Sequence, residues 1–201
     1  MTLGEYQAQA LTTLNLALDG NERLANLALG LCGETLELAR VICEACPNSR
    51  RRIIDEAGDV MWYLVVSADA LDCRLQPWDD LLDDCQFGMV STTILHHLWS
   101  MCFASGEFGE FAKKVVFQGH PLAKHRSEMV LRLEEVFRNL RDILWAYRMP
   151  VVEVLHYNVS KLKERYPDGV FSATHSVQRA ADMVSSAGGE ASREDSTKEA
   201  D

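Results

Sequence analysis

Apolar residues recur every three or four positions along most of this 201-residue chain, the spacing of one face of an α-helix. Gly and Pro are sparse before residue 165, and alternating strand-like runs rich in Val, Ile and Thr are absent. The pattern therefore predicts an all-α protein. The expected helices span 3–18, 22–45, 50–73, 77–86, 89–117, 124–147 and 150–165.

The end of the chain departs from this pattern. Apolar periodicity stops near residue 172, and residues 186–201 are polar and rich in Gly, Ser and Glu. Such a composition cannot bury enough apolar surface to offset the entropy lost on folding. We therefore expect residues 176–201 to form a disordered tail.

A short segment occurs twice. Gly33-Glu34-Thr35-Leu36-Glu37-Leu38-Ala39 is echoed by Gly106-Glu107-Phe108-Gly109-Glu110-Phe111-Ala112, and in both places a second long helix follows. We interpret the chain as two fused helical repeats, 1–86 and 87–175. Two helical hairpins of this kind would pack as a four-helix-bundle-like core with a pseudo-twofold axis.

Four acids of the first repeat lie where apolar residues are expected. Glu34 and Glu37, and then Glu56 and Asp59, are spaced three residues apart, so each pair shares a helix face. These faces also carry apolar side chains such as Leu31. Acids on a core-facing stripe are costly unless a cation pairs with them. Because no basic partner is evident nearby, the hard oxygen donors indicate Mg²⁺, with Mn²⁺ as a substitute.

Charge and composition exclude some partners. The net charge of −10 argues against binding of nucleic acid or of an anionic membrane surface. No apolar run approaches the roughly 20 residues of a membrane helix. The six cysteines are scattered through helical patterns, as in a reduced cytoplasmic protein. We therefore expect a protein of the bacterial or phage-infected host cytoplasm.

Several motifs together resemble a known family. Gly33-Glu34-Thr35-Leu36-Glu37 is followed by Glu56-Ala57-Gly58-Asp59-Val60-Met61-Trp62-Tyr63, which gives ExxE on one helix and ExxD on the next. A basic segment follows near the end, Asn158-x-x-Lys161-Leu162-x-x-Arg165-Tyr166-Pro167-Asp168-Gly169. In this order the motifs are similar to those of the MazG-type all-α nucleoside triphosphate pyrophosphohydrolases. The resemblance covers about residues 3–175.

The resemblance implies a metal-dependent hydrolysis. Mg²⁺ would be held by Glu34, Glu37, Glu56 and Asp59, with Glu37 and Glu56 as the catalytic acids. A water activated by the metal or oriented by Glu37 would attack the α-phosphorus of a (d)NTP. The products would be a (d)NMP and pyrophosphate.

The resemblance also implies substrate contacts. The residues concerned are Asn158, Lys161, Arg165, Tyr166, Lys114 and Trp62. Lys161 and Arg165 would contact the phosphates, with Lys114 as a further phosphate contact, and Asn158 would hold the sugar or the base. Trp62 would stack on the base, although an aromatic side chain at helical spacing is more often part of the core. An ordinary exposed helix end is the alternative for the basic segment, since basic residues favour helix C-termini.

The two repeats differ from the single-copy pattern in opposite ways. The first keeps the acids, but Asp79-Asp80-Leu81-Leu82-Asp83-Asp84 stands where its basic motif would lie. The second keeps the basic motif, but Arg132 aligns with Glu56 and Glu135 with Asp59. Arg132 would repel a cation and is expected to pair with Glu107 or Glu110. We therefore expect one composite centre per chain, with metal ligands from the first repeat and phosphate contacts from the second.

Two classes of function follow. The first is a Mg²⁺-dependent nucleoside triphosphate pyrophosphohydrolase, with a narrower dUTPase-like or dCTPase-like enzyme as a variant. The second is a catalytically degenerate helical module for nucleotide sensing or oligomerisation. The expected partner is a nucleoside triphosphate. A homodimer is also expected, because residues 89–103 carry more apolar side chains than one helix needs.

Overall fold

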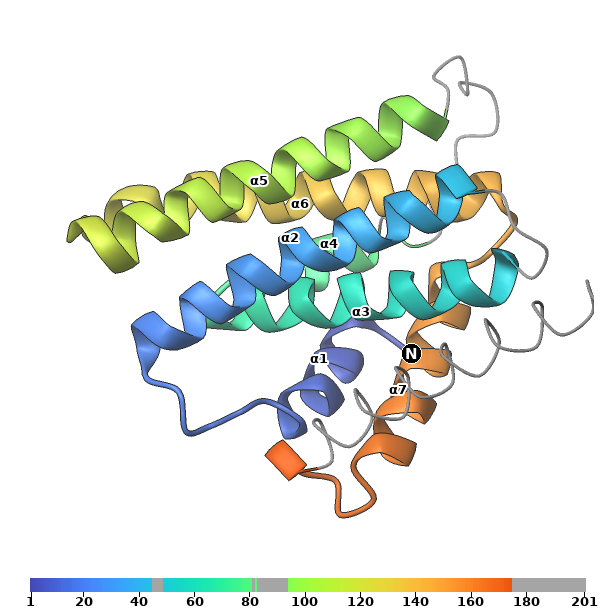
Figure 1. The fold of residues 1–201 in the computed structure, drawn as a ribbon, viewed down its shortest axis with the longest axis horizontal. Helices are drawn as coiled ribbons and strands as arrows, with labels where there is room; N and C mark the ends of the chain where they lie inside the picture. The colour runs from blue at the N-terminus through green and yellow to red at the C-terminus, as the bar shows by residue number, and fades with distance from the viewer. Residues whose placement is uncertain (45–48, 81, 83–93, 175–201) are drawn as a thin grey trace, which may run out of the picture.

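The computed structural model describes residues 1–44, 49–80, 82 and 94–174. Within these ranges every regular element is a helix, so the all-α prediction is confirmed (Figure 1). The helices are α1 (Leu3–Thr12), α2 (Gly20–Glu44), α3 (Ser49–Ala70), α4 (Gln76–Asp79), α5 (Ile94–Gln118), α6 (Leu122–Ala146) and α7 (Val151–Arg165).

Four long helices form a bundle-like core. α2 packs against α3 and α5, and α6 packs against α5 and α3, so each hairpin contacts the other through both of its helices. Helices α1 and α7 cover α3 on the side of the molecule opposite α5 (Figure 1). The apolar stripes of the helices meet in the interior, where Leu31, Met61, Phe108 and Phe137 are fully buried.

Helices α2 and α5 run antiparallel and cross at small polar residues. The Cys32 thiol donates to the Ser105 carbonyl oxygen at 3.1 Å, and the Thr35 and Ser105 hydroxyls are 2.9 Å apart. Cys32 and Ser105 are equivalent positions of the sequence repeat, since each directly precedes its Gly-Glu pair. Contact between equivalent positions is what a twofold axis produces. The crossing therefore lies where the expected pseudo-twofold axis would pass.

The first helix is shorter than the periodicity predicts. α1 ends at Thr12 rather than at residue 18, and the Thr13 hydroxyl donates to the carbonyl oxygen of Ala10 just after the helix end. A capping box then starts α2, because the Asp19 carboxylate accepts from the Glu22 amide while the Glu22 carboxylate accepts from the Asp19 amide. The predicted extent of 3–18 was therefore wrong, and the spacing Asp19-x-x-Glu22 was the overlooked signal.

Other helix boundaries of the structure agree in part with those predicted from the sequence. The expected helix at 77–86 is a short turn of helix, α4, and residues 81 and 83–86 lie outside the described part of the chain. Residues 89–93 and the expected tail at 176–201 also lie outside it. Gly119 has a φ of +70° between α5 and α6, a conformation that suits glycine at this turn. Among the described residues, no helix is both long and apolar enough to cross a membrane.

We predict that the hydroxyl contact at the α2–α5 crossing stabilises the bundle. Thr35→Val, Ser105→Ala and the double variant, compared by urea unfolding, should show a coupling free energy of about 1 kcal/mol, because both hydroxyls are buried. Ser160→Ala, which removes an exposed hydroxyl bonded only within its own helix, is the control and should change stability by less than about 0.5 kcal/mol. Strict additivity would show that the contact contributes nothing.

Candidate metal centre

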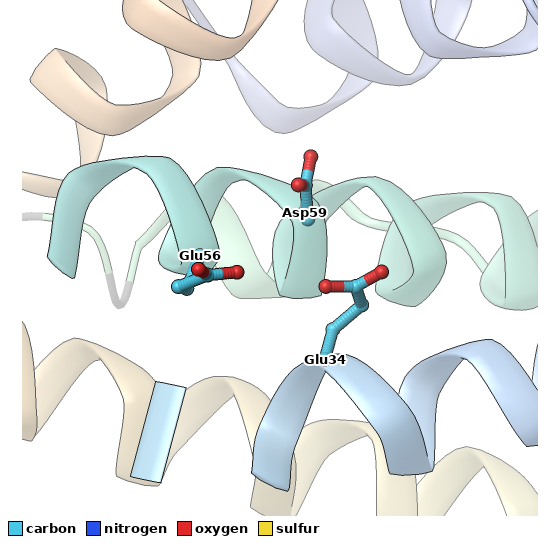
Figure 2. Close-up of side chains that lie close together, drawn as sticks. All are labelled: Glu34, Glu56 and Asp59. Atoms are coloured by element: carbon cyan, nitrogen blue, oxygen red, sulfur yellow. The ribbon is translucent and has the colours of Figure 1, made fainter. Parts of the chain in front are cut away.

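Three carboxylates meet between α2 and α3. Glu34 extends from α2, and Glu56 and Asp59 extend from successive turns of α3 (Figure 2). One carboxylate oxygen from each residue lies within 4.8 Å of the others. The three-residue spacing on α3 brings both of its acids within reach of Glu34, and Asp59 also faces α7. The structure thus brings together three of the four acids singled out in the sequence.

Glu37 is not a member of this group. It stands three residues from Glu34, the same interval that separates Glu56 from Asp59, yet it is not among the three carboxylates that lie within 4.8 Å of one another. Its side chain is exposed. It still lies close enough for its charge to raise the pKa values of Glu34 and Glu56.

The acids of the group carry more negative charge than their surroundings compensate. Burial, followed by the charges of Asp59, Glu37 and Glu56, raises the pKa of Glu34 to about 8. Burial, followed by the charges of Glu37 and Asp59, raises the pKa of Glu56 to about 7. A partly buried set of hard oxygen donors with raised pKa values is the environment that a divalent cation would stabilise. The donor set therefore fits Mg²⁺.

A basic residue does approach the acids, contrary to the expectation that none lies nearby. The buried Lys161 amine, on α7, lies 2.5 Å from Asp59 Oδ2 and 2.7 Å from Asp55 Oδ1. The Asn158 amide donates to Asp59 Oδ1 at 3.3 Å, and the Tyr6 hydroxyl donates to Asn158 Oδ1 at 2.7 Å. Asp59 is therefore oriented by α7. One lysine does not neutralise the cluster, since the pKa values of Glu34 and Glu56 stay raised despite its charge.

Sequence reasoning missed two members of this network. Asp55 stands four residues before Asp59, which places both on one face of α3, and that spacing was a usable signal. Tyr6 is fully buried on α1, and only the packing of α1 against α3 and α7 reveals its partner.

A cavity of about 300 Å³ opens beside Glu34 and Asp59. Its walls include Tyr63 and three of the predicted substrate-binding residues, Trp62, Arg165 and Tyr166. The volume lies at the lower end of the range for small-molecule sites.

Two contacts fix the aromatic wall of the cavity. The Trp62 indole N–H donates to the Thr13 hydroxyl at 2.9 Å, and the Trp62 and Tyr63 rings meet edge to face at 4.9 Å. A Cβ at Gly30 would lie 2.0 Å from the Tyr63 ring, so this glycine makes the room that the ring occupies. Burial, followed by the charges of Glu34 and Asp59, raises the pKa of Tyr63 to about 12.

Arg165 carries an unsatisfied donor at this cavity. Its Nε is buried and has no hydrogen-bond partner among the described residues. Buried donors of this kind are uncommon in folded proteins.

Lys114 is not brought to this site. Its amine lies 3.8 Å from Glu110 on the same helix and 5.3 Å from the centre of the Phe111 ring. It does not line the cavity beside Glu34 and Asp59. The expected phosphate contact from Lys114 is therefore absent from the described arrangement, because these contacts hold its side chain along α5.

The acids of the second repeat are paired with an arginine. Arg132 Nε lies 3.3 Å from Glu107 Oε2, an ion-pair contact rather than an aligned hydrogen bond, and Arg132 also pairs with Glu135. The expectation that Arg132 pairs with Glu107 or Glu110 is confirmed for Glu107, whereas Glu110 pairs with lysines of its own helix. The positive charge of the guanidinium thus compensates the acids of the second repeat, as a metal ion would otherwise do.

No match was found when the chain was compared with protein families, curated proteins and solved structures. The resemblance to the MazG-type enzymes therefore rests on the motifs alone. Any function has to be argued from the geometry of the site.

We predict that the acid cluster makes stability depend on pH and on Mg²⁺. The raised pKa values of Glu34 and Glu56 let the folded protein keep protons that the unfolded chain releases above about pH 4.5. Stability should therefore fall as the pH rises from about 4.5 to 8. Without metal, Tm should be a few degrees lower at about pH 8.5 than at about pH 6, and Mg²⁺ should raise it more at the higher pH.

The control isolates these two acids. The double variant Glu34→Gln with Glu56→Gln should lose both the extra pH dependence and the Mg²⁺ effect, whereas Glu164→Gln, at an exposed position, should keep them. A Mg²⁺ shift in Tm that is the same for the double variant and the wild type would contradict the assignment.

We predict that Arg132 keeps the second cluster free of metal. Arg132→Glu should raise the number of Mn²⁺ ions bound per chain by about one, measured by isothermal titration calorimetry or electron paramagnetic resonance. The change leaves Glu107, Glu128 and Glu135 with a further carboxylate and without their cation. Arg138→Glu, which loses only the contact with Glu134, should leave the number unchanged. An unchanged number in a folded Arg132→Glu protein would refute the idea.

Proposed function

We propose that this chain is a Mg²⁺-dependent nucleoside triphosphate pyrophosphohydrolase that converts a (d)NTP to a (d)NMP and pyrophosphate. The observation that carries the proposal is a carboxylate cluster with raised pKa values beside a cavity that Arg165 also lines. A cation site beside an anion-binding group is what a metal-complexed polyphosphate requires.

Glu34, Glu56 and Asp59 would hold the metal. When bound, Mg²⁺ would neutralise phosphate charge and polarise the bond that breaks. Lys161 and Asn158 act on Asp59 and hold its carboxylate in place, as partners of metal ligands commonly do. Lys161 is thus better placed to position a ligand than to contact phosphate directly.

Glu37 would act as the general base for the attacking water. It lies beside the three acids without belonging to their group, so its carboxylate stays available to orient a water molecule and accept its proton. Arg165 would bind the phosphates, because its planar guanidinium suits bidentate contact and its side chain lines the same cavity.

The aromatic wall would receive the base. Trp62 is held by Thr13, and Tyr166 contacts Phe171 with ring centres 5.9 Å apart on the same cavity. Aromatic faces of this kind bind bases by stacking. A narrow-specificity enzyme of dUTPase or dCTPase type is a variant of the same proposal.

The setting of the proposed enzyme is the cytoplasm. The four cysteines that the structure describes, Cys32, Cys43, Cys73 and Cys102, are free thiols, as expected in a reducing compartment. The net charge of −10 favours a small substrate held through a metal over nucleic acid.

A catalytically degenerate module is the second candidate. The observation that favours it is the ion pairing of Arg132 with Glu107 and Glu135, which removes one of two metal clusters. The uncompensated first cluster opposes it, since buried acids without a role cost stability.

We predict turnover that depends on the first cluster. With a panel of NTPs and dNTPs and Mg²⁺, chromatography should detect nucleoside monophosphate and pyrophosphate rather than diphosphate and orthophosphate. Glu56→Gln should lower kcat by more than the roughly 10–100-fold typical of partners behind the metal ligands. Glu135→Gln, the same substitution at the position of the second repeat that aligns with Asp59, should leave kcat within about twofold.

Three outcomes would count against this proposal. Absence of turnover on every nucleotide would refute the enzyme. Full activity in Glu56→Gln would move the site away from this cluster, and equal losses in Glu56→Gln and Glu135→Gln would remove the distinction between the repeats.

A further inference from the structure

Helix α1 contributes a side chain to the network behind the carboxylate cluster, although it carries none of the clustered acids. Tyr6 lies on α1 and is fully buried. Its hydroxyl donates to Asn158 Oδ1 on α7 at 2.7 Å, and the Asn158 amide donates in turn to Asp59 Oδ1 on α3 at 3.3 Å. We call these two contacts the Tyr6–Asn158–Asp59 relay. Side chains from three helices are therefore joined at one carboxylate.

The relay has a defined direction. An ionised carboxylate only accepts hydrogen bonds, so the end of the Asn158 amide that faces Asp59 is its NH₂ group. The carbonyl oxygen of the same amide then faces Tyr6, whose O–H supplies the donor. Tyr6 therefore determines which end of the Asn158 amide faces Asp59.

The amide of Asn158 is enclosed by the fold. Its side chain is fully buried and lies against α3 at Gly58, the residue before Asp59. A Cβ at Gly58 would lie 2.8 Å from Asn158 Nδ2 and 2.9 Å from its Cβ, so this glycine makes the room that the side chain occupies. Buried polar groups need partners within the protein. Loss of the Tyr6 hydroxyl would remove the donor that the structure gives to Asn158 Oδ1.

Contacts on both sides of Tyr6 hold α1 in place. The Leu3 amide donates to Asp79 Oδ1 at 2.7 Å, and the Gln7 side-chain amide donates to the carbonyl oxygen of Val65 on α3 at 2.8 Å. Helix α1 also packs against α3, α4 and α7. Tyr6 therefore presents its hydroxyl from a firmly held helix, which is what a residue that positions another side chain requires.

The two oxygens of Asp59 have partners of different kinds. Oδ2 contacts the charged Lys161 amine, which Asp59 shares with Asp55, whereas Oδ1 accepts from the neutral Asn158 amide. A lysine competes with a metal ion for the charge of a carboxylate, but a neutral donor orients the carboxylate and leaves its charge available to the ion. The relay is thus suited to hold Asp59 in an orientation that binds a metal.

A purely structural role for the hydroxyl is the alternative, since a buried tyrosine normally finds some hydrogen-bond acceptor. The Gly58 carbonyl oxygen, 3.4 Å from the Tyr6 hydroxyl, would meet that need. The much shorter contact goes instead to Asn158, a side chain that itself donates to a clustered acid. This choice of acceptor favours a role in positioning Asp59.

We propose that Tyr6 is a positioning residue of the metal centre, which orients the Asp59 carboxylate for a divalent cation through the Asn158 amide. The inference rests on the proposed function, which requires the cation. It adds α1 to the helices that determine metal affinity. Tyr6 acts only through Asn158 and touches neither the metal nor the substrate.

Titration with Mn²⁺, followed by electron paramagnetic resonance of the free ion, tests the proposal. Tyr6→Phe keeps the buried ring and removes the hydroxyl. It should raise the Mn²⁺ dissociation constant about three- to tenfold, the loss that corresponds to one neutral buried hydrogen bond. Asn158→Leu, which removes the amide next to Asp59, should raise it roughly 10–100-fold.

Two control variants separate positioning from a loss of stability. Tyr157→Phe removes a hydroxyl from the neighbour of Asn158 on α7, outside the relay. Ser105→Ala removes a buried hydroxyl from α5 and lowers stability without touching the relay. Both should leave the Mn²⁺ dissociation constant unchanged.

Nuclear magnetic resonance supplies a measurement that needs no metal. The side-chain amide signals of Asn158 are identified by their absence from the spectrum of Asn158→Leu. In the metal-free protein, Tyr6→Phe should shift these signals and speed the exchange of their protons with water, because the amide loses its partner. Tyr157→Phe should leave the exchange rate unchanged.

The possible failures are distinguishable. Asn158 signals that Tyr6→Phe leaves unchanged would show that the relay does not form. An unchanged Mn²⁺ dissociation constant in a folded Tyr6→Phe protein, or an equal rise in Ser105→Ala, would overturn the positioning role and leave the metal centre standing. Absence of Mn²⁺ binding by the wild type would overturn both this inference and the proposed function.

Discussion

The contact between the Lys161 amine and the carboxylates of Asp59 and Asp55 is the interaction on which the candidate site depends. It joins the last long helix to the helix that carries two of the clustered acids. A buried lysine between two carboxylates is strongly held, since removal of the lysine leaves both carboxylates uncompensated. It is nevertheless one positive charge facing a larger set of acids, and burial together with the remaining negative charge raises the pKa values of Glu34 and Glu56. That remaining charge is the physical reason to infer a metal.

The same constraint is met differently in the second half of the chain. There Arg132 lies among Glu107 and Glu135 and balances them from within the fold. The acids are thus compensated in two different ways. In the second half the guanidinium of Arg132 balances them, whereas in the first half Lys161 compensates only part of their charge. The contact between Cys32 and Ser105 places both halves about one crossing point. This asymmetry in charge, more than the fold, is why we propose a cation site in the first half and none in the second.

Residue spacing predicted the features of the site that depend on a single helix. It missed the contacts that depend on how the helices pack together. The three-residue interval anticipated Glu56 and Asp59 on one side of α3, and the chain pattern anticipated the all-α bundle. Glu37 stands at the same interval from Glu34, yet it lies outside the group, so the interval alone does not decide which acids meet. The contact of Lys161 with Asp59 spans 102 residues, and no local rule predicts such a pairing. The contacts of Gly30 with Tyr63 and of Tyr6 with Asn158 likewise depend on how the helices pack, and no local sequence pattern indicates them.

The central claim is that Glu34, Glu56 and Asp59 form a metal centre completed by α7. Anomalous diffraction from crystals grown with Mn²⁺ tests it most directly, because it locates the ion without reference to activity. The account predicts one strong anomalous peak among these three carboxylates, with none beside Glu107 and Arg132, and loss of the peak in Glu56→Gln. No peak at the three carboxylates under saturating Mn²⁺, or a peak at the second cluster alone, would contradict it.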